Sequence, residues 1–391
     1  MRIAIFTDSY APVISGVVTS IKMLRDGLEK LGHEVYVITT TNPQVKKELD
    51  PHVIRYIGVP FPFKSLTEYR IVPFSMRKVK KLHELNFDVI HVHTEFTIGQ
   101  LGIKLKKKYN TPLAYTMHTL YEEYIHHVSA FLEKHFKEES IQIIRNTTKK
   151  IVELADATFV PSKKILHLLD DVMHADANIN IVPTGLDLAP FRKENFKDED
   201  IARLRKELGI EPDDFVMTYV GRIAPEKDIE FLIEAYEKFV VENKNARFLI
   251  VGGGYHEPEL AKIIGEKGLE DKIIMTGLVK WEEIGIYYHL GDCFVSASTS
   301  ETQGLTFVEA LAAANVVIAT KDEAVESIIE NGYNGFIYEN ENDLLFALKT
   351  TMCDKILMDK MRKNALLSAQ PYSKEEYSRK ALSIYQSIVK K

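Results

Sequence analysis

The side chains best suited to chemistry lie in one short segment, 298–309, which reads Ser-Thr-Ser-Glu-Thr-Gln-Gly-Leu-Thr-Phe-Val-Glu. The segment follows an apolar run and is predicted to begin a helix at Gly304, Leu305 and Thr306. The first N–H groups of a helix have no partner within it and lie at the positive end of its dipole, which favours a phosphate. We therefore expect Gly304, Leu305 and Thr306 to contact the phosphate of a ligand.

Two carboxylates, Glu301 and Glu309, lie in the same segment. Like charges about 4 Å apart repel by roughly 4 kcal/mol at an effective dielectric constant of about 20, so these carboxylates are not expected to face that phosphate. The neutral hydroxyls of a ribose or another sugar are suitable donors to them, and each such bond contributes roughly 1.5 to 3 kcal/mol. Alternatively, Thr306 and Glu309 have the spacing of a capping box, in which Glu309 only satisfies backbone donors.

The cations that a diphosphate needs are available earlier in the chain. Gly221 and Arg222 follow the predicted strand 215–220, and Lys227 precedes a predicted helix. Arginine offers a fixed fork for two oxygens, and lysine offers a mobile point charge. These residues would bind a diphosphate, or they would form a solvated turn beside a helix.

Two residues of the first half lie where a ligand could reach them. His118 follows the predicted strand 113–117, where an imidazole would hydrogen-bond a sugar hydroxyl or stabilise developing charge, or would have only a structural role. Gly16 follows Ser15 between the first strand and the first helix, where it would allow close approach of a ligand or simply form a turn. The G-x-G-x-x-G and Walker A patterns are absent.

Three other groups of polar or glycine residues indicate a function less clearly. His91 and His93 lie on one face of a predicted strand with Glu95 nearby, but the set lacks a third ligand, so no metal is expected. The acidic run 198–200 is a literal D-x-D pattern in a polar stretch and is interpreted as a solvated charge run. Three glycines at 252–254 permit close approach of a partner without identifying it.

Alternating strands and helices must position these residues. Strands are predicted at 2–6, 34–39, 89–93, 113–117 and 158–160, and again at 215–220, 248–251, 273–275, 294–295 and 316–319, with amphipathic stretches such as 17–31 between them. This alternation implies right-handed βαβ units, parallel sheets, and ligands beyond the carboxyl ends of the strands.

The domain organisation follows from the same alternation. We expect two doubly wound α/β domains, 1–186 and 201–373, joined by a polar linker at 187–200. The last helix, 374–390, is expected to pack back on the first domain.

Length and composition agree with an ordinary two-domain protein. The chain has 391 residues, and single cores stop growing at about 250 to 300 residues. No apolar run reaches the roughly 18 residues of a membrane span, and no signal-peptide pattern follows Met1, so a cytoplasmic location is expected. The two cysteines, Cys293 and Cys353, predict neither a disulfide framework nor a metal site.

Positive charge gathers in the first half. Residues 1–185 contain 24 Lys and Arg against 20 Asp and Glu, and the rest contain 26 against 36. Aromatic and basic residues mix in runs that are typical of a surface facing anionic lipid, although basic helix faces are often only solvated. The runs are 61–64, 69–70, 77–81, 104–108 and 121–136. Nucleic acid is not an expected partner, because the basic residues form no continuous stripe and the pI is near 6.1.

Taken together, these residues resemble the GT-B fold glycosyltransferases of family 4 over essentially the whole chain. The most specific element is the E-x7-E motif formed by Glu301 and Glu309, accompanied by Gly221, Arg222 and Lys227. The resemblance implies two Rossmann-like domains with a cleft between them. It also implies that Arg222 and Lys227 hold the donor diphosphate, that Glu309 holds the ribose, and that Glu301 contacts the sugar hydroxyls.

The resemblance further assigns residues of the first half. It implies that His118 lies beside the donor sugar and that Gly16 contacts the donor, although many members have a Gly-Gly pair where this chain has Ser15 and Gly16. It implies retention of configuration without a metal or cofactor, the nucleotide-sugar being a substrate. No residue stands out as a covalent nucleophile, so a same-face displacement assisted by the departing phosphate is expected.

Three further motifs look like those of the bacterial 1,2-diacylglycerol 3-glucosyltransferases, the monoglucosyldiacylglycerol synthases. They are Ile-Ser-Gly-Val-Val-Thr-Ser at 14–20, His-Val-His-Thr-Glu-Phe at 91–96 and Thr-Met-His-Thr-Leu-Tyr at 116–121. This likeness implies a UDP-glucose donor, a diacylglycerol acceptor and peripheral binding to the inner face of the cell membrane. The alternatives are a family 4 enzyme with another lipid, polysaccharide or small-sugar acceptor, a glycosidase, and a non-catalytic nucleotide-sugar-binding protein.

Overall fold

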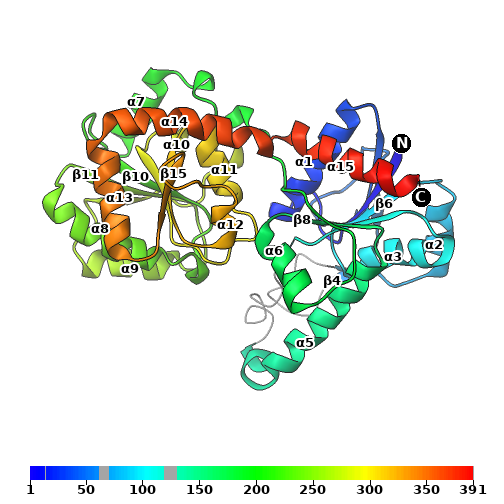
Figure 1. Cartoon of the computed structure of the whole chain (residues 1–391). Helices are drawn as coiled ribbons and strands as arrows, with labels where there is room; N and C mark the ends of the chain where they lie inside the picture. The colour runs from blue at the N-terminus through cyan, green and yellow to red at the C-terminus, as the bar shows by residue number, and fades with distance from the viewer. Residues whose placement is uncertain (14, 61–69, 119–129, 391) are drawn as a thin grey trace. The chain divides into compact units, whose positions relative to one another are not determined.

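The computed structural model of the chain describes residues 1–13, 15–60, 70–118 and 130–390. It divides into two compact units, one formed by Met1–Gly185 with Lys374–Lys391 and the other by Leu186–Ser373. Each unit is built on a parallel sheet covered by helices, which confirms the predicted α/β class (Figure 1). Of the runs that the sequence predicts to face lipid, 61–64 lies wholly outside the described residues, and 69–70 and 121–136 lie partly outside them.

The first unit contains a seven-stranded parallel sheet in the order β3-β2-β1-β6-β7-β8-β9. Its strands are β1 Arg2–Phe6, β2 Glu34–Thr40, β3 Val53–Tyr56, β6 Val89–Val92, β7 Leu113–Thr116, β8 Ala157–Val160 and β9 Ile179–Ile181. Successive side chains of β1 enter opposite cores, Ile3 and Ile5 on one face and Ala4 and Phe6 on the other, as the two-residue period of a strand requires. A short antiparallel pair, β4 Val59–Pro60 and β5 Arg70–Ile71, lies outside this sheet.

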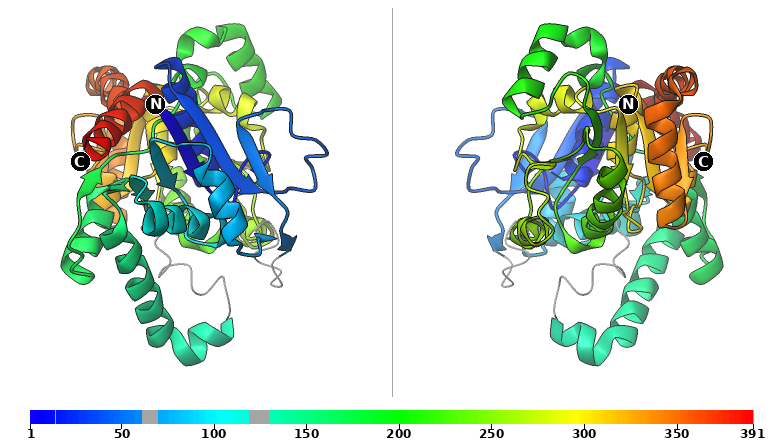
Figure 2. Two further views of the ribbon diagram at one scale, coloured as in Figure 1. Left: turned by 90° about the vertical axis from the view of Figure 1, so that its right-hand side faces the viewer. Right: turned by 90° about the vertical axis from the view of Figure 1, so that its left-hand side faces the viewer.

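Helices cover both faces of this sheet. On one face α1 Gly16–Lys30 and α15 Lys374–Val389 lie side by side (Figure 1 and Figure 2). Their close contact depends on Gly27, because a Cβ there would lie 1.9 Å from Ser378 Oγ. The other face is covered by α2 Met76–His83, α3 Thr97–Tyr109, α5 Ala130–Leu154 and α6 Lys163–His167.

The second unit contains a six-stranded parallel sheet in the order β12-β11-β10-β13-β14-β15. Its strands are β10 Phe215–Val220, β11 Ala246–Val251, β12 Ile273–Met275, β13 Cys293–Ser296, β14 Val316–Thr320 and β15 Gly335–Tyr338. The core on one face includes α8 Ile229–Glu242, α9 Glu257–Glu266 and α13 Glu341–Cys353. The opposite core includes α10 Ile284–Tyr288, α11 Leu305–Ala312 and α14 Lys355–Ala369.

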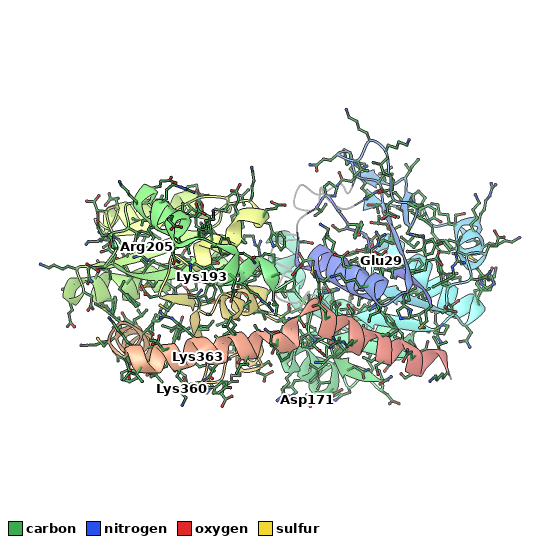
Figure 3. The ribbon with its side chains drawn as sticks, turned by 90° about the horizontal axis from the view of Figure 1, so that it is seen from above. Glu29, Asp171, Lys193, Arg205, Lys360 and Lys363 are labelled. Atoms are coloured by element: carbon green, nitrogen blue, oxygen red, sulfur yellow. The ribbon has the colours of Figure 1, made fainter. Side chains whose placement is uncertain are left out.

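The segment 187–200 is not the free linker that its polar composition predicts. It belongs to the second unit and forms two 3-10 turns, Ala189–Phe191 and Lys193–Asn195, followed by α7 Asp198–Glu207. Phe191 is fully buried, its ring meets that of Tyr288 edge-on at 5.7 Å, and Leu188 is buried in the same core, so two apolar side chains hold this stretch against the second unit. Lys193, labelled in Figure 3, pairs with Asp198 at the start of α7, where carboxylates favour the helix dipole.

Among the described residues, none of the helices combines the length and the apolar character needed to span a bilayer.

Candidate active site

The strand order of the second unit creates a switch point between β10 and β13. Going outward, β11 follows β10 on one side and β14 follows β13 on the other. The helices after these two strands, α8 and α11, pack on opposite faces of the sheet (Figure 1). The loops that leave β10 and β13 therefore separate at this point, which is where open parallel sheets bind ligands.

The structure brings Lys227 and Glu301 together across 74 residues of sequence. Lys227 ends the 3-10 turn Pro225–Lys227 just before α8, and its Nζ lies 2.5 Å from Glu301 Oε1 and 3.3 Å from Ser298 Oγ. The two charged side chains are only 16% and 18% exposed, so this ion pair is partly shielded from water. An ammonium has three donors, and its contacts with described residues use two of them, which leaves one N–H for a phosphate oxygen.

Arg222 forms the second cationic position and is more open to water. Its Nη2 lies 2.5 Å from Glu226 Oε1, and its side chain is 49% exposed. The hydroxyl of Tyr219 donates to the carbonyl of Arg222 at 2.9 Å, which holds the turn after β10. Glu226 was not among the residues predicted from sequence, although an arginine and a glutamate four residues apart offer a signal for such a pair.

Glu309 accepts a hydrogen bond from the hydroxyl of Tyr288, with 2.6 Å between the oxygens. Burial raises the pKa of the Glu309 carboxyl to about 7, and the bond from Tyr288 only partly opposes that rise. The pKa of Tyr288 also lies well above its usual value, because the phenol is buried and faces Glu309. Tyr288 lies in α10, and no sequence pattern links it to Glu309.

The capping-box interpretation of Glu309 is wrong. The N-cap of α11 is Gly304, so Thr306 lies inside the first turn of the helix rather than before it. Gly304 has a φ of +82°, and a Cβ there would lie 2.4 Å from Phe307 Cδ2, so the residue must be glycine. Leu305 and Thr306 are partly exposed in the first turn, where backbone N–H groups have no partner within the helix.

The glycines at 252–254 allow another loop of the same unit to come close to their backbone. A Cβ on Gly252 would lie 1.9 Å from the carbonyl oxygen of Gly221, and one on Gly254 would lie 1.9 Å from that of Ile223. The backbone of Ile223 also donates to Gly253 at 3.0 Å. The glycine run therefore packs closely against the loop that carries Arg222.

This packing predicts different stabilities for two neighbouring alanine variants. Gly254→Ala should lower the free energy of unfolding by about 1 to 3 kcal/mol, because its Cβ meets a backbone oxygen. Gly253→Ala is the matched control, since the nearest atom to its Cβ would be 3.4 Å away. Urea unfolding of both variants measures the difference, and equal midpoints would contradict the role given to Gly254.

In the first unit, His118 follows β7 and joins a chain of hydrogen-bonded imidazoles. Its Nε2 lies 2.8 Å from Nδ1 of His93, whose Nε2 lies 3.2 Å from Nδ1 of His91. Burial lowers the pKa of His118 to about 4 and places the pKa values of His91 and His93 well below the usual value. All three rings are therefore neutral at physiological pH.

Gly16 and Ser15 lie at the start of α1. Gly16 is exposed in the first turn, and the side chain of Ser15 accepts a hydrogen bond from the N–H of Val18 at 3.3 Å. Ser15 is thus the N-cap of α1, which accounts for a serine at this position. Gly16 and His118 belong to the first unit, whereas all the other predicted site residues belong to the second.

The described part of the chain contains no group of three or more His, Cys, Asp or Glu side chains placed to hold a metal ion. Both His91 and His93 use their ring nitrogens in hydrogen bonds.

Two parallel α/β units, with cations and carboxylates at the switch point of the second, define a GT-B glycosyltransferase. Family comparisons agree: residues 14–190 match "Glycosyltransferase Family 4" and residues 200–367 match "Glycosyl transferases group 1". The structure of Anabaena Alr3699/HepE in complex with UDP and glucose superposes with a TM-score of 0.75 at 20% identity, covering 99% of this chain and 100% of that one.

Two relatives indicate more closely which glycosyltransferases this chain resembles. The alpha-monoglucosyldiacylglycerol synthase of Acholeplasma laidlawii is 40% identical over 391 residues, which is 100% of this chain and 98% of that protein. The protein of the same name from Streptococcus pneumoniae is 33% identical over 351 residues, 89% of this chain and 77% of the relative. The chain belongs to the family of glycosyltransferases that contains these synthases.

Proposed function

We propose that the protein transfers glucose from UDP-glucose to the 3-hydroxyl of 1,2-diacylglycerol, with retention, to form α-monoglucosyldiacylglycerol. The observation that carries this proposal is the 40% identity, over the full length of the chain, to a relative named for that product. The donor site of the second unit supports it, because the site joins cations for a diphosphate to carboxylates for hydroxyls.

Each site residue has a role in this proposal. Arg222, Lys227 and the first turn of α11 at Gly304, Leu305 and Thr306 bind the diphosphate and stabilise the charge that develops on it. Glu309 accepts from the ribose hydroxyls, and Glu301 accepts from the hydroxyls of the sugar. Gly16 and His118 keep their predicted roles toward the donor, and no metal or cofactor is required.

The reaction is a same-face substitution at the anomeric carbon. The bond from that carbon to the β-phosphate oxygen breaks, and a bond from the acceptor hydroxyl oxygen forms on the same face. The proton of the acceptor hydroxyl passes to the departing phosphate, so UDP leaves with the negative charge that Arg222 and Lys227 offset.

The first unit exposes apolar and basic side chains that would suit a lipid acceptor. Five apolar side chains are exposed near the carboxyl edge of its sheet, after β3 or beside the starts of α2 and α3: Ile57, Val59, Phe74, Met76 and Phe96. The N–H of Val72 donates to Thr97 Oγ1 at 3.2 Å, which ties the segment before α2 to the start of α3. Basic side chains are exposed nearby on α2, namely Arg77, Lys80 and Lys81. We propose that this surface binds the anionic face of the cell membrane peripherally.

Acceptor assays with vesicles test the function directly. Incubation with UDP-glucose should release UDP and give monoglucosyldiacylglycerol, identified by mass spectrometry, only when diacylglycerol is present in the vesicles. The rate should rise when anionic lipid is added. Equal activity toward a soluble sugar would contradict the lipid acceptor, UDP binding without turnover on any acceptor would indicate a binding protein, and hydrolysis of a nitrophenyl glycoside would indicate a glycosidase.

The membrane surface has its own test. Phe74→Ala should weaken the affinity for anionic vesicles, measured by co-sedimentation, by about tenfold or more, since burying one aromatic side chain contributes roughly 1.5 to 3 kcal/mol. Phe346→Ala in the second unit is the matched control, because Phe346 is 69% exposed and Phe74 is 55% exposed. Equal binding of the two variants would contradict the surface assigned to Phe74.

A further inference from the structure

A continuous line of hydrogen bonds runs from His118 through the buried interior of the first unit to its last helix. Beyond His118 and His93, Nδ1 of His91 lies 2.6 Å from the hydroxyl of Tyr385 on α15. Nε2 of His91 lies 2.7 Å from Oγ1 of Thr116. His91, His93, Thr116 and Tyr385 are all buried, so water does not compete for these contacts.

Neutral rings make the protons in this line interdependent. A neutral imidazole carries one N–H, so one of its nitrogens donates and the other accepts. Since His91 and His93 each use both nitrogens, the choice made at one end of the line fixes the tautomer at the other end.

Two proton arrangements place an N–H opposite a bare nitrogen at both ring-to-ring contacts, and in each of them Nδ1 of His91 is shared between Tyr385 and His93. In the first, the Tyr385 hydroxyl donates to His91, His93 donates to His91 through Nε2–H, and His118 donates to His93 through Nε2–H. His118 then has a bare Nδ1 that accepts hydrogen bonds. In the second arrangement every ring proton is on the opposite nitrogen, and His118 carries an Nδ1–H that donates.

The tyrosine end favours the first arrangement. The phenol of Tyr385 contacts one ring nitrogen of His91 and the aliphatic hydroxyl of Thr116 contacts the other, and a phenol is the stronger donor of the two. Within the described residues the Tyr385 hydroxyl has no other hydrogen-bond partner, and a buried donor without an acceptor is destabilising, so this hydroxyl should donate to His91.

We propose that Tyr385 is a positioning residue that fixes, through His91 and His93, the His118 tautomer whose Nδ1 accepts a hydrogen bond from a substrate hydroxyl. The consequence for turnover rests on the proposed function, whereas the tautomer itself does not. The sequence leaves two ligand-binding roles open for His118, a hydrogen bond to a sugar hydroxyl and stabilisation of developing charge. A neutral acceptor favours the first role, since an uncharged lone pair binds a hydroxyl rather than stabilising negative charge.

The tautomer is measurable on the full chain without any change to Tyr385. Nitrogen NMR of protein labelled with ¹⁵N-histidine distinguishes an N–H nitrogen from a bare one, and loss of one signal set in His118→Gln assigns the residue. The expected wild-type result is a protonated Nε2 and a bare Nδ1 at His118. A protonated Nδ1 in the wild type would overturn the proposal.

Two tyrosine variants on one helix then test the positioning role. Tyr385→Phe removes the hydroxyl donor and keeps the aromatic ring. The fraction of His118 in the Nδ1–H tautomer should therefore rise. The kcat/KM should fall about tenfold, which is the equivalent of one lost hydrogen bond. Tyr377→Phe is the matched control: Tyr377 is also buried on α15, but its hydroxyl bonds Ser20 at 2.9 Å instead of the histidines. That variant should keep the wild-type tautomer and remain within about twofold of the wild-type rate.

The outcomes separate the inference from the proposed function. If Tyr385→Phe matches Tyr377→Phe in spectrum or in rate, the positioning role is wrong. If the wild-type protein shows the bare Nδ1 but no glucosyl transfer to diacylglycerol, the proposed function fails while the hydrogen-bond line is supported.

Discussion

Lys227→Ala is expected to lower kcat/KM for UDP-glucose by about 100- to 1000-fold, the range seen when one preorganised donor to a developing negative charge is removed. The variant loses the third N–H that the wild-type ammonium offers to a phosphate oxygen. It also leaves the Glu301 carboxylate, now without its ion-pair partner at 2.5 Å, near the place proposed for the diphosphate. Both changes act against the departing UDP, so kcat should fall as well as donor affinity.

Release of UDP from vesicles containing diacylglycerol measures this loss. Lys238→Ala is the matched control, because Lys238 also pairs with a glutamate of the second unit, Glu341 at 2.7 Å, but on an exposed surface where such pairs contribute little. It should retain the wild-type rate, and thermal unfolding should show both variants folded. A Lys227→Ala enzyme with more than about a third of the wild-type kcat/KM would rule out the diphosphate role, since that loss is far below what one such donor supplies.

The sequence predicts every central strand of the two large sheets and one of their edge strands, β12. β1, β10 and β12 have the predicted bounds, whereas β3, β9 and β15 were not predicted. These three strands lie at the edges of the two large sheets, and the short pair β4 and β5, which was not predicted either, lies outside them. An edge strand has one neighbour and is partly exposed, as the burial of β3 and β9 shows, so it lacks the continuous apolar run of a central parallel strand.

The types of the site residues could be predicted, but their pairings could not. The contact of Lys227 with Glu301 depends on β10 and β13 being neighbours, which is a property of the sheet order rather than of spacing. The partners Glu226 and Tyr288 likewise became visible only in the fold. The linker prediction failed at 187–200 because composition counts the many polar residues, whereas two buried apolar side chains, Leu188 and Phe191, join that stretch to the core of the second unit.

Binding of UDP-glucose is expected to strengthen about tenfold as the pH rises from about 6 to about 8, because donor binding favours an ionised Glu309. The ribose hydroxyls donate to a carboxylate, whereas a protonated carboxyl must first lose its proton. Burial raises the pKa of this carboxyl from 4.5 to about 7 in the free protein, so it is mostly protonated below that pH and mostly ionised above it. The same raised pKa means that the free protein loses stability as the pH rises from about 4.5 to about 7, where the unfolded chain ionises first.

The choice of ligand and of variants isolates Glu309 in this measurement. Each phosphate of UDP-glucose is esterified on two sides and keeps one charge throughout this range, so the ligand does not titrate. Calorimetry at pH 7 should detect release of about half a proton on binding, since about half of the Glu309 carboxyls are then protonated. Glu309→Gln should bind weakly with no pH dependence, while Glu282→Gln, at an exposed position before α10, should behave as the wild type. A pH dependence that persists in Glu309→Gln would assign the titration to another group and remove the ribose role from Glu309.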